Sequence, residues 1–589
     1  TVTIDFDTIP ANSQAVITVT ATVDNVAANQ DATVLTNSAT YVYEPVDGGS
    51  QNISGGAAVE ASTTVKEPVL SIAKAITSGP AAPDAGDILG YTVTISHDAA
   101  STAAAFEVAF LDTLDPQTEL VLLADGGTAD PVATLNGTAT GGLTGTPATG
   151  NASLAGTFDI PNDGSNVVIV YYVRLKNTIQ PGDTLANDAD IVWTSLNDTV
   201  VGERDGSGGI NDYAATDTTS RTSADSADLL KTRNTDTYGA GDADVRVGDV
   251  ITYHLDVTLP EGTTTSTVVT DALPAGLEFV DTVSINTDTG TGTDDAYVAV
   301  APFTYTDIAV TSTPAAGATG TLTWTLGNIA NAGDNNTGNN VFAIVYRARV
   351  WNAPAIAGTS TAKQNTATLA YKLADGTDAT PETDTETVTV EQPLLTIAKA
   401  SSPADGSTDL VQGQEVTFTL TIANTGAAPA YDPVVRDTVP VGMRGGTITG
   451  VVATSIKING ADKTLRQPTA TGTFADDGVI EWDLDIGGAN AYTIPAAQSL
   501  VLVYTVDVDG DVANNTAMTN SASVTHYYSF DDDAVPSGSA DGDRRDYGSV
   551  GPDTVTLTTA VPANLSKAAT ATAVVGETIT YTIEVPADG

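Results

Sequence analysis

Lysine, aspartate and asparagine recur in a fixed order along this chain, each within a short run that alternates apolar and polar residues. The lysine ends an apolar run such as LSIAKA or LTIAKA, the aspartate follows a run such as FEVAFLDT, and the asparagine lies in a run such as LANDADIV or MTNSASV. An amine, a carboxyl group and a carboxamide can form a salt bridge with a hydrogen-bonding neighbour, or the amine can attack the carboxamide while the carboxyl group moves protons. The three sets are Lys74, Asp112 and Asn187; Lys231, Asp271 and Asn365; and Lys399, Asp437 and Asn520.

Strand alternation predicts that these polar side chains point towards a hydrophobic core. Leu70, Ile72 and Lys74 fall on one face because successive side chains of a strand alternate between faces. Met518 and Asn520 share a face for the same reason. Lysine is almost never fully buried unless it is paired, and four of the ten lysines in the chain occupy this repeated position. An unpaired buried ammonium would be severely destabilising, so each lysine needs a partner inside its domain.

Two interpretations of these sets remain open. In the first, lysine and aspartate form a buried salt bridge with asparagine hydrogen-bonded beside it, which can fix a fold without any chemistry. In the second, apolar burial lowers the pKa of the lysine and raises that of the aspartate, so that a neutral amine lies beside a protonated carboxyl group. The amine would then attack the carboxamide and release ammonia in a single-turnover step, since the folded core holds the partners together.

The elements that position these residues form a long internal repeat. The lysine-bearing strands recur at intervals of 157, 168 and 168 residues, and a glycine-led strand follows each of them, as in GDILGYTVTI and GQEVTFTLTI. Each unit contains about seven short alternating strands separated by turn residues, without helical periodicity. This pattern predicts an all-β chain of tandem immunoglobulin-like antiparallel β-sandwiches.

The repeat divides the chain into three complete units and two partial ones. We expect the C-terminal half of a unit over 1–66, complete units over 67–226, 227–391 and 392–562, and the first strands of another over 563–589. Asn37 and Lys567 are the half-unit equivalents of the buried residues.

The junctions between units are short, and prolines stiffen several of them. Pro68, Pro393 and Pro562 lie at these links, where a fixed φ angle favours an elongated, rod-like array. The junction near Asp225 has no proline and is expected to bend more.

At these motifs the chain resembles two groups of bacterial surface domains. One is the tandem surface repeat known as domain of unknown function eleven, to which the lysine strand, STVVTDALPAG and MTNSA are similar. The other is the isopeptide-forming Cna-type sandwich of adhesins and pili, in which a lysine on the first strand condenses with an asparagine on a late strand, assisted by an acidic residue. The resemblance implies the isopeptide pairs Lys74–Asn187, Lys231–Asn365 and Lys399–Asn520, with Asp112, Asp271 and Asp437 catalysing crosslinking within the molecule.

The charge of the chain argues against two classes of binding partner. It carries 73 acidic and 22 basic residues, a formal net charge of −51. Such a surface repels nucleic acid and anionic membranes, so binding to either is not expected. The absence of cysteine excludes disulfides and thiolate metal sites, and no run of about 18 apolar residues predicts insertion into a membrane. The chain opens on TVTIDFDTIP, which is typical of the middle of a domain, and we expect it to be a segment of a longer protein.

Acidic loops follow the asparagine strands, and carboxylates between glycine turns can bind calcium. The loop of the third unit, FDDDAVPSGSADGDRRDYGS, is rich in aspartate, although its spacing does not match an EF-hand. A solvated acidic loop is the other interpretation. The candidate calcium ligands are Asp531, Asp532, Asp533, Asp541 and Asp543.

These features predict a structural stalk or fibre segment of a large extracellular protein on a microbial cell surface, and not an enzyme. His97, His254 and His526 lie at different repeat positions, and no nucleophile elbow or phosphate loop occurs. The expected partners are neighbouring repeats or subunits of the same protein, with surface glycans as a further candidate. Two alternatives stay open: an adhesin that binds a glycan or a partner cell through its loops, and a subunit of an extracellular filament or surface layer.

Overall fold

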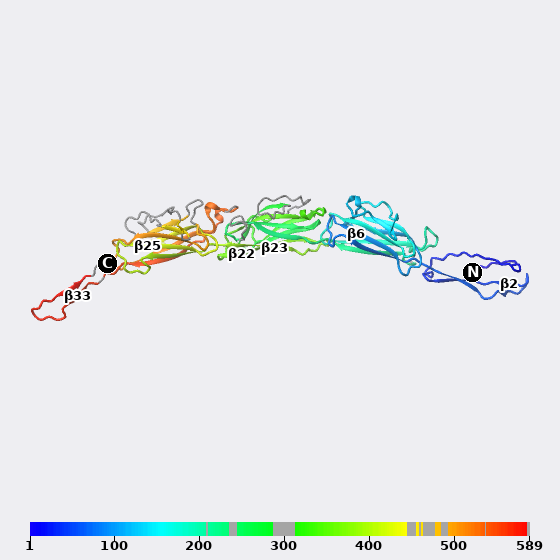
Figure 1. Cartoon of the computed structure of the whole chain (residues 1–589), viewed down its shortest axis with the longest axis horizontal. Coiled ribbons are helices and arrows are strands. Elements are labelled where there is room, and N and C mark those ends of the chain that lie inside the picture. The colour runs from blue at the N-terminus through cyan, green and yellow to red at the C-terminus, as the bar shows by residue number, and fades with distance from the viewer. Residues whose placement is uncertain are drawn as a thin grey trace.

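The computed structural model is an elongated row of β-sandwiches (Figure 1). It describes residues 1–207, 210–234, 244–286, 313–443, 455–458, 461–462, 478–484, 493–535, 538–562 and 564–585. The predicted all-β class, with immunoglobulin-like antiparallel sandwiches in an elongated rod, is confirmed. The described residues add four single-turn 3₁₀ helices: η1 (Leu123–Asp125), η3 (Thr337–Asn339), η4 (Asp532–Ala534) and η5 (Asp541–Asp543). No helix within these ranges is long and apolar enough to span a membrane.

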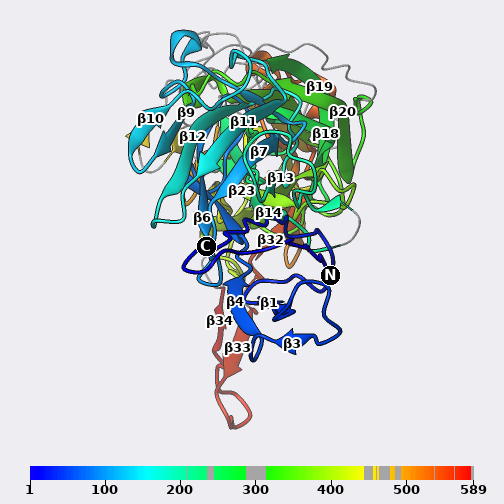
Figure 2. The same ribbon diagram turned by 90° about the vertical axis from the view of Figure 1, so that its right-hand side faces the viewer.

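The first sandwich consists of two facing sheets, seen end-on in Figure 2. One sheet has the order β10-β9-β12-β6-β5 with β8 beside β12, and the other has the order β11-β7-β13-β14. Burial alternates along the strands because every second side chain points between the sheets. The strands are β5 (Leu70–Ser78), β6 (Ile88–His97), β7 (Ala105–Thr113), β8 (Thr118–Leu120), β9 (Val132–Leu135), β10 (Thr138–Thr140), β11 (Ser153–Ile160), β12 (Asn166–Leu175), β13 (Thr184–Thr194) and β14 (Ala214–Thr222).

The second sandwich repeats this plan with the sheet orders β15-β17-β21-β19 and β16-β23-β22-β18-β20. Its pairs are antiparallel except for the two-residue contact between β16 and β23. The strands are β15 (Asp228–Asn234), β16 (Asp244–Val245), β17 (Val250–Thr258), β18 (Gly262–Ala272), β19 (Leu277–Asn286), β20 (Thr321–Asn331), β21 (Val341–Val350), β22 (Ser360–Lys372) and β23 (Glu382–Glu391).

The third sandwich has the sheet orders β24-β25-β30-β27-β28 and β29-β26-β31-β32. Its strands are β24 (Leu395–Ser402), β25 (Glu415–Asn424), β26 (Tyr431–Thr438), β27 (Ser455–Ile458), β28 (Ala461–Asp462), β29 (Val479–Asp483), β30 (Ser499–Asp507), β31 (Ala517–Tyr528) and β32 (Val550–Thr558). Short antiparallel pairs extend from the two ends of the row: β1 (Val34–Ala39) with β4 (Val59–Thr64), β2 (Val42–Tyr43) with β3 (Ile53–Ser54), and β33 (Ser566–Ala569) with β34 (Tyr581–Glu584).

The topology places the predicted lysine and the predicted aspartate and asparagine on opposite sheets. In each sandwich the lysine strand (β5, β15 or β24) lies in one of the two sheets. The aspartate strand and the asparagine strand are neighbours in the other sheet. Each aspartate lies opposite an alanine, and the asparagine comes two residues before that alanine, on the same face. The register pairs are Asp112 with Ala189, Asp271 with Ala367, and Asp437 with Ala522. The small alanine side chain leaves room between the sheets for a lysine from across the core.

Each sandwich has its own hydrophobic core between its sheets. Aromatic rings fill the centre, with Tyr91 stacked on Tyr171 at 5.3 Å between ring centroids in the first sandwich. Trp324 and Trp482 fill the same layer in the second and third sandwiches and are fully buried. Removing this apolar area from water stabilises the fold by roughly 25 cal/mol per Å² and fixes the strands that carry the polar residues.

An arginine joins the second sandwich to the third. Arg545, in the loop after β31, donates to the carbonyl oxygens of Ala353 and Ile356 at 2.7 and 2.9 Å. It also donates to Asn352 Oδ1 at 2.7 Å. A planar guanidinium with several satisfied donors fixes the direction of its neighbours as well as their distance. The contact should therefore restrict bending at this junction.

Main-chain contacts join the first sandwich to the second. The Thr263 amide donates to the Ile179 carbonyl at 2.8 Å. Gly86 has φ +83° and lies so close to Gly333 that a Cβ atom would clash with the Gly333 main chain. Both the positive φ angle and the close approach of the two main-chain segments therefore require glycine at position 86. Greater bending near Asp225 stays a prediction.

We expect Arg545→Ala to widen the range of angles between the second and third sandwiches, because the substitution removes three donors across the junction. Small-angle scattering of the chain should give an elongated particle, and the variant should give a broader distribution of long interatomic distances. Arg436→Ala is the matched control, since Arg436 is exposed on β26. A compact wild-type particle, or identical curves for Arg545→Ala and wild type, would contradict a rod held by this contact.

Candidate functional site

A buried lysine contacts a buried aspartate in each sandwich. In the first, Lys74 Nζ donates to Asp112 Oδ2 over 2.7 Å, and neither side chain is exposed to solvent. The corresponding ion pairs of the other two sandwiches are Lys231–Asp271 and Lys399–Asp437, with all four side chains equally buried. The structure thus brings together the lysine and the aspartate of each predicted set.

The asparagine joins the first cluster through a tyrosine hydroxyl. Asn187 Nδ2 donates to Tyr171 OH over 2.9 Å, and Tyr171 OH donates to Asp112 Oδ2 over 2.7 Å. The aspartate oxygen that receives the lysine therefore also receives the tyrosine. The phenol oxygen lies between the carboxylate and the carboxamide nitrogen.

The same arrangement recurs in the other sandwiches. In the third, Asn520 Nδ2 donates to Tyr504 OH at 2.9 Å, and Tyr504 OH donates to Asp437 Oδ2 at 2.6 Å. In the second, Asn365 Nδ2 donates to Tyr346 OH at 2.9 Å. The lysine Nζ lies 3.3 Å from this hydroxyl in the second sandwich and 3.1 Å from its counterpart in the third. Each lysine, aspartate and asparagine thus belongs to one hydrogen-bonded cluster.

An aromatic ring covers each lysine on the side of the second strand. The Nζ atom of Lys74 lies 5.3 Å from the ring centroid of Tyr91. The corresponding distances are 4.6 Å to Tyr253 in the second sandwich and 4.6 Å to Phe418 in the third. An ammonium over an aromatic face gains some electrostatic stabilisation, and the ring also excludes water from the amine.

Burial shifts the pKa values of the lysine and the aspartate towards their neutral forms. It lowers the pKa of Lys74, although Asp112 opposes this shift, and it raises the pKa of Asp112, although Lys74 opposes that one. Desolvation is the main cause in both cases because water no longer solvates either charge. The pKa is lowered by burial in Lys231 and Lys399 and raised by burial in Asp271 and Asp437.

Two acceptor oxygens in each cluster are left without a donor among the described residues. They are Oδ1 of the aspartate and Oδ1 of the asparagine, which are buried in all three sandwiches. A buried acceptor without a donor is costly, and such groups in folded proteins call for an explanation. The unpaired carboxylate oxygen means that fewer hydrogen bonds stabilise the charged form of the aspartate, which agrees with the raised pKa of that carboxyl group in each sandwich.

The tyrosines were not identified from the sequence. Tyr171, Tyr346 and Tyr504 lie in strongly apolar strands, where a tyrosine is usually a core residue with a satisfied hydroxyl. A signal did exist: each of the three complete units has a tyrosine in the strand before its asparagine. The distance from tyrosine to asparagine is 16, 19 and 16 residues in the three units.

A second aspartate anchors the main chain of each lysine and was also missed. The Lys74 amide donates to Asp217 Oδ2 on β14 over 2.7 Å. The equivalent acceptors are Asp384 for Lys231 and Asp553 for Lys399, both at 2.7 Å. The contact ties the first strand of the unit to the last strand, which belongs to the opposite sheet. An Asp-Thr pair in TDTTS, TDTET and PDTVT marks the position in the sequence.

The half-unit residues lie in exposed positions. Asn37 is on β1, and Lys567 is on β33, where its Nζ atom lies 4.6 Å from the ring centroid of Tyr581. Neither side chain is buried as its counterparts in the sandwiches are.

The acidic loop of the third sandwich surrounds an arginine. Asp531 and Asp532 bring carboxylate oxygens within 4.8 Å of one another and of Asp432. Arg544 donates to Asp432 at 2.9 Å and to Asp532 at 3.1 Å, and its Nε atom lies 3.1 Å from Asp541. The guanidinium therefore already supplies the positive charge that a bound cation would bring.

The remaining candidate calcium ligands lie apart from that group. Asp543 pairs with Arg349 of the second sandwich, and the Asp533 amide donates to Asp531 Oδ1 at 2.9 Å in η4. The five predicted ligands thus do not converge on one point.

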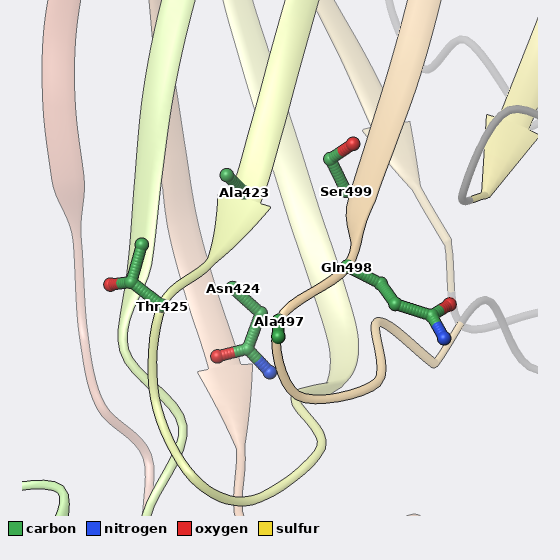
Figure 3. Close-up of a pocket in the computed structure, with 6 residues that line it drawn as sticks. All are labelled: Ala423, Asn424, Thr425, Ala497, Gln498 and Ser499. Atoms are coloured by element: carbon green, nitrogen blue, oxygen red, sulfur yellow. The ribbon is translucent and has the colours of Figure 1, made fainter.

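A shallow pocket of about 380 Å³ lies at one end of the third sandwich (Figure 3). Its side chains are short or polar, and the buried Asn424 is committed to the surrounding loops. Asn424 Nδ2 donates to the carbonyls of Ala428 and Ile494 at 2.8 and 2.9 Å, and its oxygen accepts from the Gly426 amide at 3.0 Å. The pocket lining has no charged group that could activate the hydroxyls of Thr425 and Ser499, so we assign it a structural role. The lining residues are Ala423, Asn424, Thr425, Ala497, Gln498 and Ser499.

One family model matches part of the chain. It is the bacterial alpha-2-macroglobulin MG10 domain, and the match covers residues 221–317, about one sixth of the sequence. This is not the tandem surface repeat named above, whose assignment is not confirmed. No curated protein matches the chain.

Solved structures with a similar fold include bacterial pilins. The major pilin subunit of Bacillus cereus is 9% identical, with a TM-score of 0.21, over 60% of this chain and 74% of the pilin chain. The major pilin GBS80 of Streptococcus agalactiae is 13% identical, with a TM-score of 0.20, over 55% and 91%. The collagen adhesin of S. aureus is 11% identical, with a TM-score of 0.17, over 56% and 94%. At these identities the likeness concerns the type of fold alone.

We expect Asp553→Ala to weaken the attachment of β24 to β32. A hydrogen bond to a charged group contributes about 1.5–3 kcal/mol, and Asp553 is half-buried, so a loss of about 1.5 kcal/mol is expected. Hydrogen exchange at the Lys399 amide measures this opening free energy directly. Asp507→Ala, at an exposed position of β30, should leave it unchanged. Equal protection in Asp553→Ala and wild type would contradict an anchoring role.

Proposed function

We propose that this chain is a load-bearing segment of an extracellular stalk or fibre on a microbial cell surface, stiffened by an isopeptide bond between lysine and asparagine in each sandwich. The observation that carries the proposal is the threefold recurrence of one buried cluster of lysine, aspartate, tyrosine and asparagine. A buried salt bridge that only supports the fold needs no carboxamide beside it. Here the carboxamide recurs within the same hydrogen-bonded cluster as the amine.

The crosslinking step balances without any outside reagent. Proton transfer from the lysine to the aspartate gives a neutral amine and a carboxyl group, in the direction that burial favours. The amine nitrogen then forms a bond to Cγ of the asparagine, and the bond from Cγ to Nδ2 breaks. The displaced nitrogen keeps its two hydrogens, gains a third and leaves as ammonia. The attacking nitrogen sheds one hydrogen as it becomes an amide nitrogen, and the aspartate takes up that hydrogen and ends as a carboxyl group. Each sandwich reacts only once, so the aspartate assists the bond and the protein is not thereby an enzyme.

The bond would connect the two sheets of each sandwich. It runs from β5 to β13 in the first sandwich and closes a chain loop of 113 residues, with loops of 134 and 121 residues in the other two. Closing such loops stabilises a folded chain by roughly 4–5 kcal/mol, by analogy with disulfides. The chain has no cysteine, so such a bond would supply the covalent support that disulfides give to other extracellular proteins.

A tensile load fits both the bond and the row of sandwiches. Force applied along the row would pass from the lysine strand of a unit through the bond to its asparagine strand, and the residues between them would remain folded. The arginine and main-chain contacts at the junctions pass force from one sandwich to the next. The partners in this proposal are therefore neighbouring units of the same or an adjacent chain, and the acidic surface keeps such an array soluble.

The intact mass of the folded chain tests the crosslink. We expect the mass to lie below that of the unmodified sequence by three ammonias, about 17 Da each. Lys399→Ala should retain one of them, because the third sandwich then has no nucleophile. Asp437→Ala should likewise leave the third sandwich unlinked. Lys372→Ala is the matched control, since Lys372 is partly exposed and pairs with Asp378 outside any cluster, and it should lose all three.

An unmodified mass for fully folded wild-type protein would contradict the crosslink. The clusters would then be buried salt bridges that fix the fold. A loss of three ammonias in Lys399→Ala would contradict the assignment of the nucleophile.

A further inference from the structure

We propose that the bridging tyrosine hydroxyl, in Tyr171, Tyr346 and Tyr504, is a catalytic group that delivers the proton to the departing amide nitrogen. This inference rests on the proposed crosslink and adds a residue to its mechanism. The hydroxyl contacts the bond that breaks, whereas the aspartate contacts the amine that attacks.

The geometry of the first sandwich gives the proton a direct path through Tyr171. Asp112 Oδ2 accepts from Lys74 Nζ at 2.7 Å and from Tyr171 OH at 2.7 Å. Tyr171 OH in turn accepts from Asn187 Nδ2 at 2.9 Å. The proton lost by the amine therefore starts on a carboxyl oxygen whose next neighbour is the phenol, and the phenol is next to the leaving nitrogen. All three side chains of this path from Asp112 to Asn187 are buried, so water does not compete with them.

The transfer conserves every atom. When the amine adds to the carboxamide carbon, Nδ2 loses its amide character and becomes a proton acceptor. The phenol then gives its proton to Nδ2 and takes the proton of the aspartate carboxyl group in the same step. Ammonia leaves and the phenol regains its starting form. The aspartate, now a carboxylate, takes the proton that the attacking nitrogen sheds as it becomes an amide nitrogen, and so ends as a carboxyl group. A positioned acid of this kind typically contributes about 10²–10⁴-fold to a rate.

The phenol remains neutral throughout because its surroundings disfavour an anion. Burial is the main cause that raises the pKa of Tyr171 well above its usual value, and the nearby Asp112 carboxylate acts in the same direction. A phenol of this kind relays a proton by donating one and accepting another in the same step. It does not act as a phenolate base.

A comparison among the three units separates this hydroxyl from the other aromatic side chain beside the lysine. The ring over the lysine belongs to Tyr91, Tyr253 and Phe418 in the three sandwiches, so one unit lacks a hydroxyl there. The bridging position is tyrosine in all three. The Tyr91 hydroxyl also lies within reach of Asn187, but its counterpart in the third sandwich has no hydroxyl to offer.

The test compares two phenylalanine substitutions in the first sandwich of the full chain. We expect Tyr171→Phe to slow bond formation by about 100-fold or more, so that freshly purified protein retains one ammonia by intact mass and loses it slowly or not at all. Tyr91→Phe reproduces the aromatic pair of the third sandwich and should link as fast as wild type. Hydrogen exchange in β12 should show equal protection for both variants, which separates a chemical defect from a folding defect.

A second variant covers the case in which Tyr171→Phe does not fold. Replacing Tyr171 with 3,5-difluorotyrosine keeps the ring and the hydroxyl but makes the phenol more acidic. The rate of ammonia loss and its pH profile should then change, whereas a hydroxyl that only fills space would leave both unaltered.

The outcomes distinguish this inference from the crosslink itself. In one outcome, wild-type protein loses three ammonias, and Tyr171→Phe or the difluorotyrosine variant loses them at the wild-type rate. This result overturns the proposed catalytic role of the tyrosine and leaves the crosslink intact. If wild-type protein loses no ammonia, the crosslinking reaction does not occur, and the proposed role of the tyrosine is wrong as well.

Discussion

A lysine buried between two β-sheets must have its charge satisfied or lose it, and the rest of each sandwich is arranged around that constraint. Lys74 reaches the core from one sheet, and Asp112 reaches it from the other. Desolvation disfavours both charges, so the pair is drawn towards an amine and a carboxyl group. Neutralisation makes the lysine a nucleophile, and a carboxamide lies in the same hydrogen-bonded cluster. In the proposed crosslink, the burial that costs the fold stability also makes the amine reactive.

The strand topology supplies this geometry three times because the register is tightly fixed. A shift of one residue would turn every inward side chain to the solvent face. The alanine opposite each aspartate leaves space for the lysine. The aspartate on the last strand holds the main chain of the lysine strand, as Asp217 does for Lys74. Loops differ in length among the units, yet the cluster recurs because these strand positions set it.

Much of this could be predicted from the sequence, for reasons of periodicity. Alternation along the strands gave the fold class and the inward direction of Lys399, Asp437 and Asn520. The hydroxyl of Tyr504 could not be found in this way, because a tyrosine in an apolar strand fits a core without any further role. Asp553 was hidden for another reason: its contact crosses from one sheet to the other, and alternation within a strand says nothing about pairs between sheets. The predicted calcium ligands rest on composition alone, and composition does not show that Arg544 lies among Asp432, Asp532 and Asp541.

Pulling on single molecules tests most directly whether the clusters form load-bearing bonds. If Lys399 and Asn520 are joined, the 120 residues between them cannot extend. Unfolding of the third sandwich should then release about 400 Å less than its full contour length, at roughly 3.5 Å per residue. The contour lengths released by the first and second sandwiches should be reduced in the same way, in proportion to the number of residues between lysine and asparagine. Release of the full contour length from every sandwich would contradict a covalent bond between the sheets.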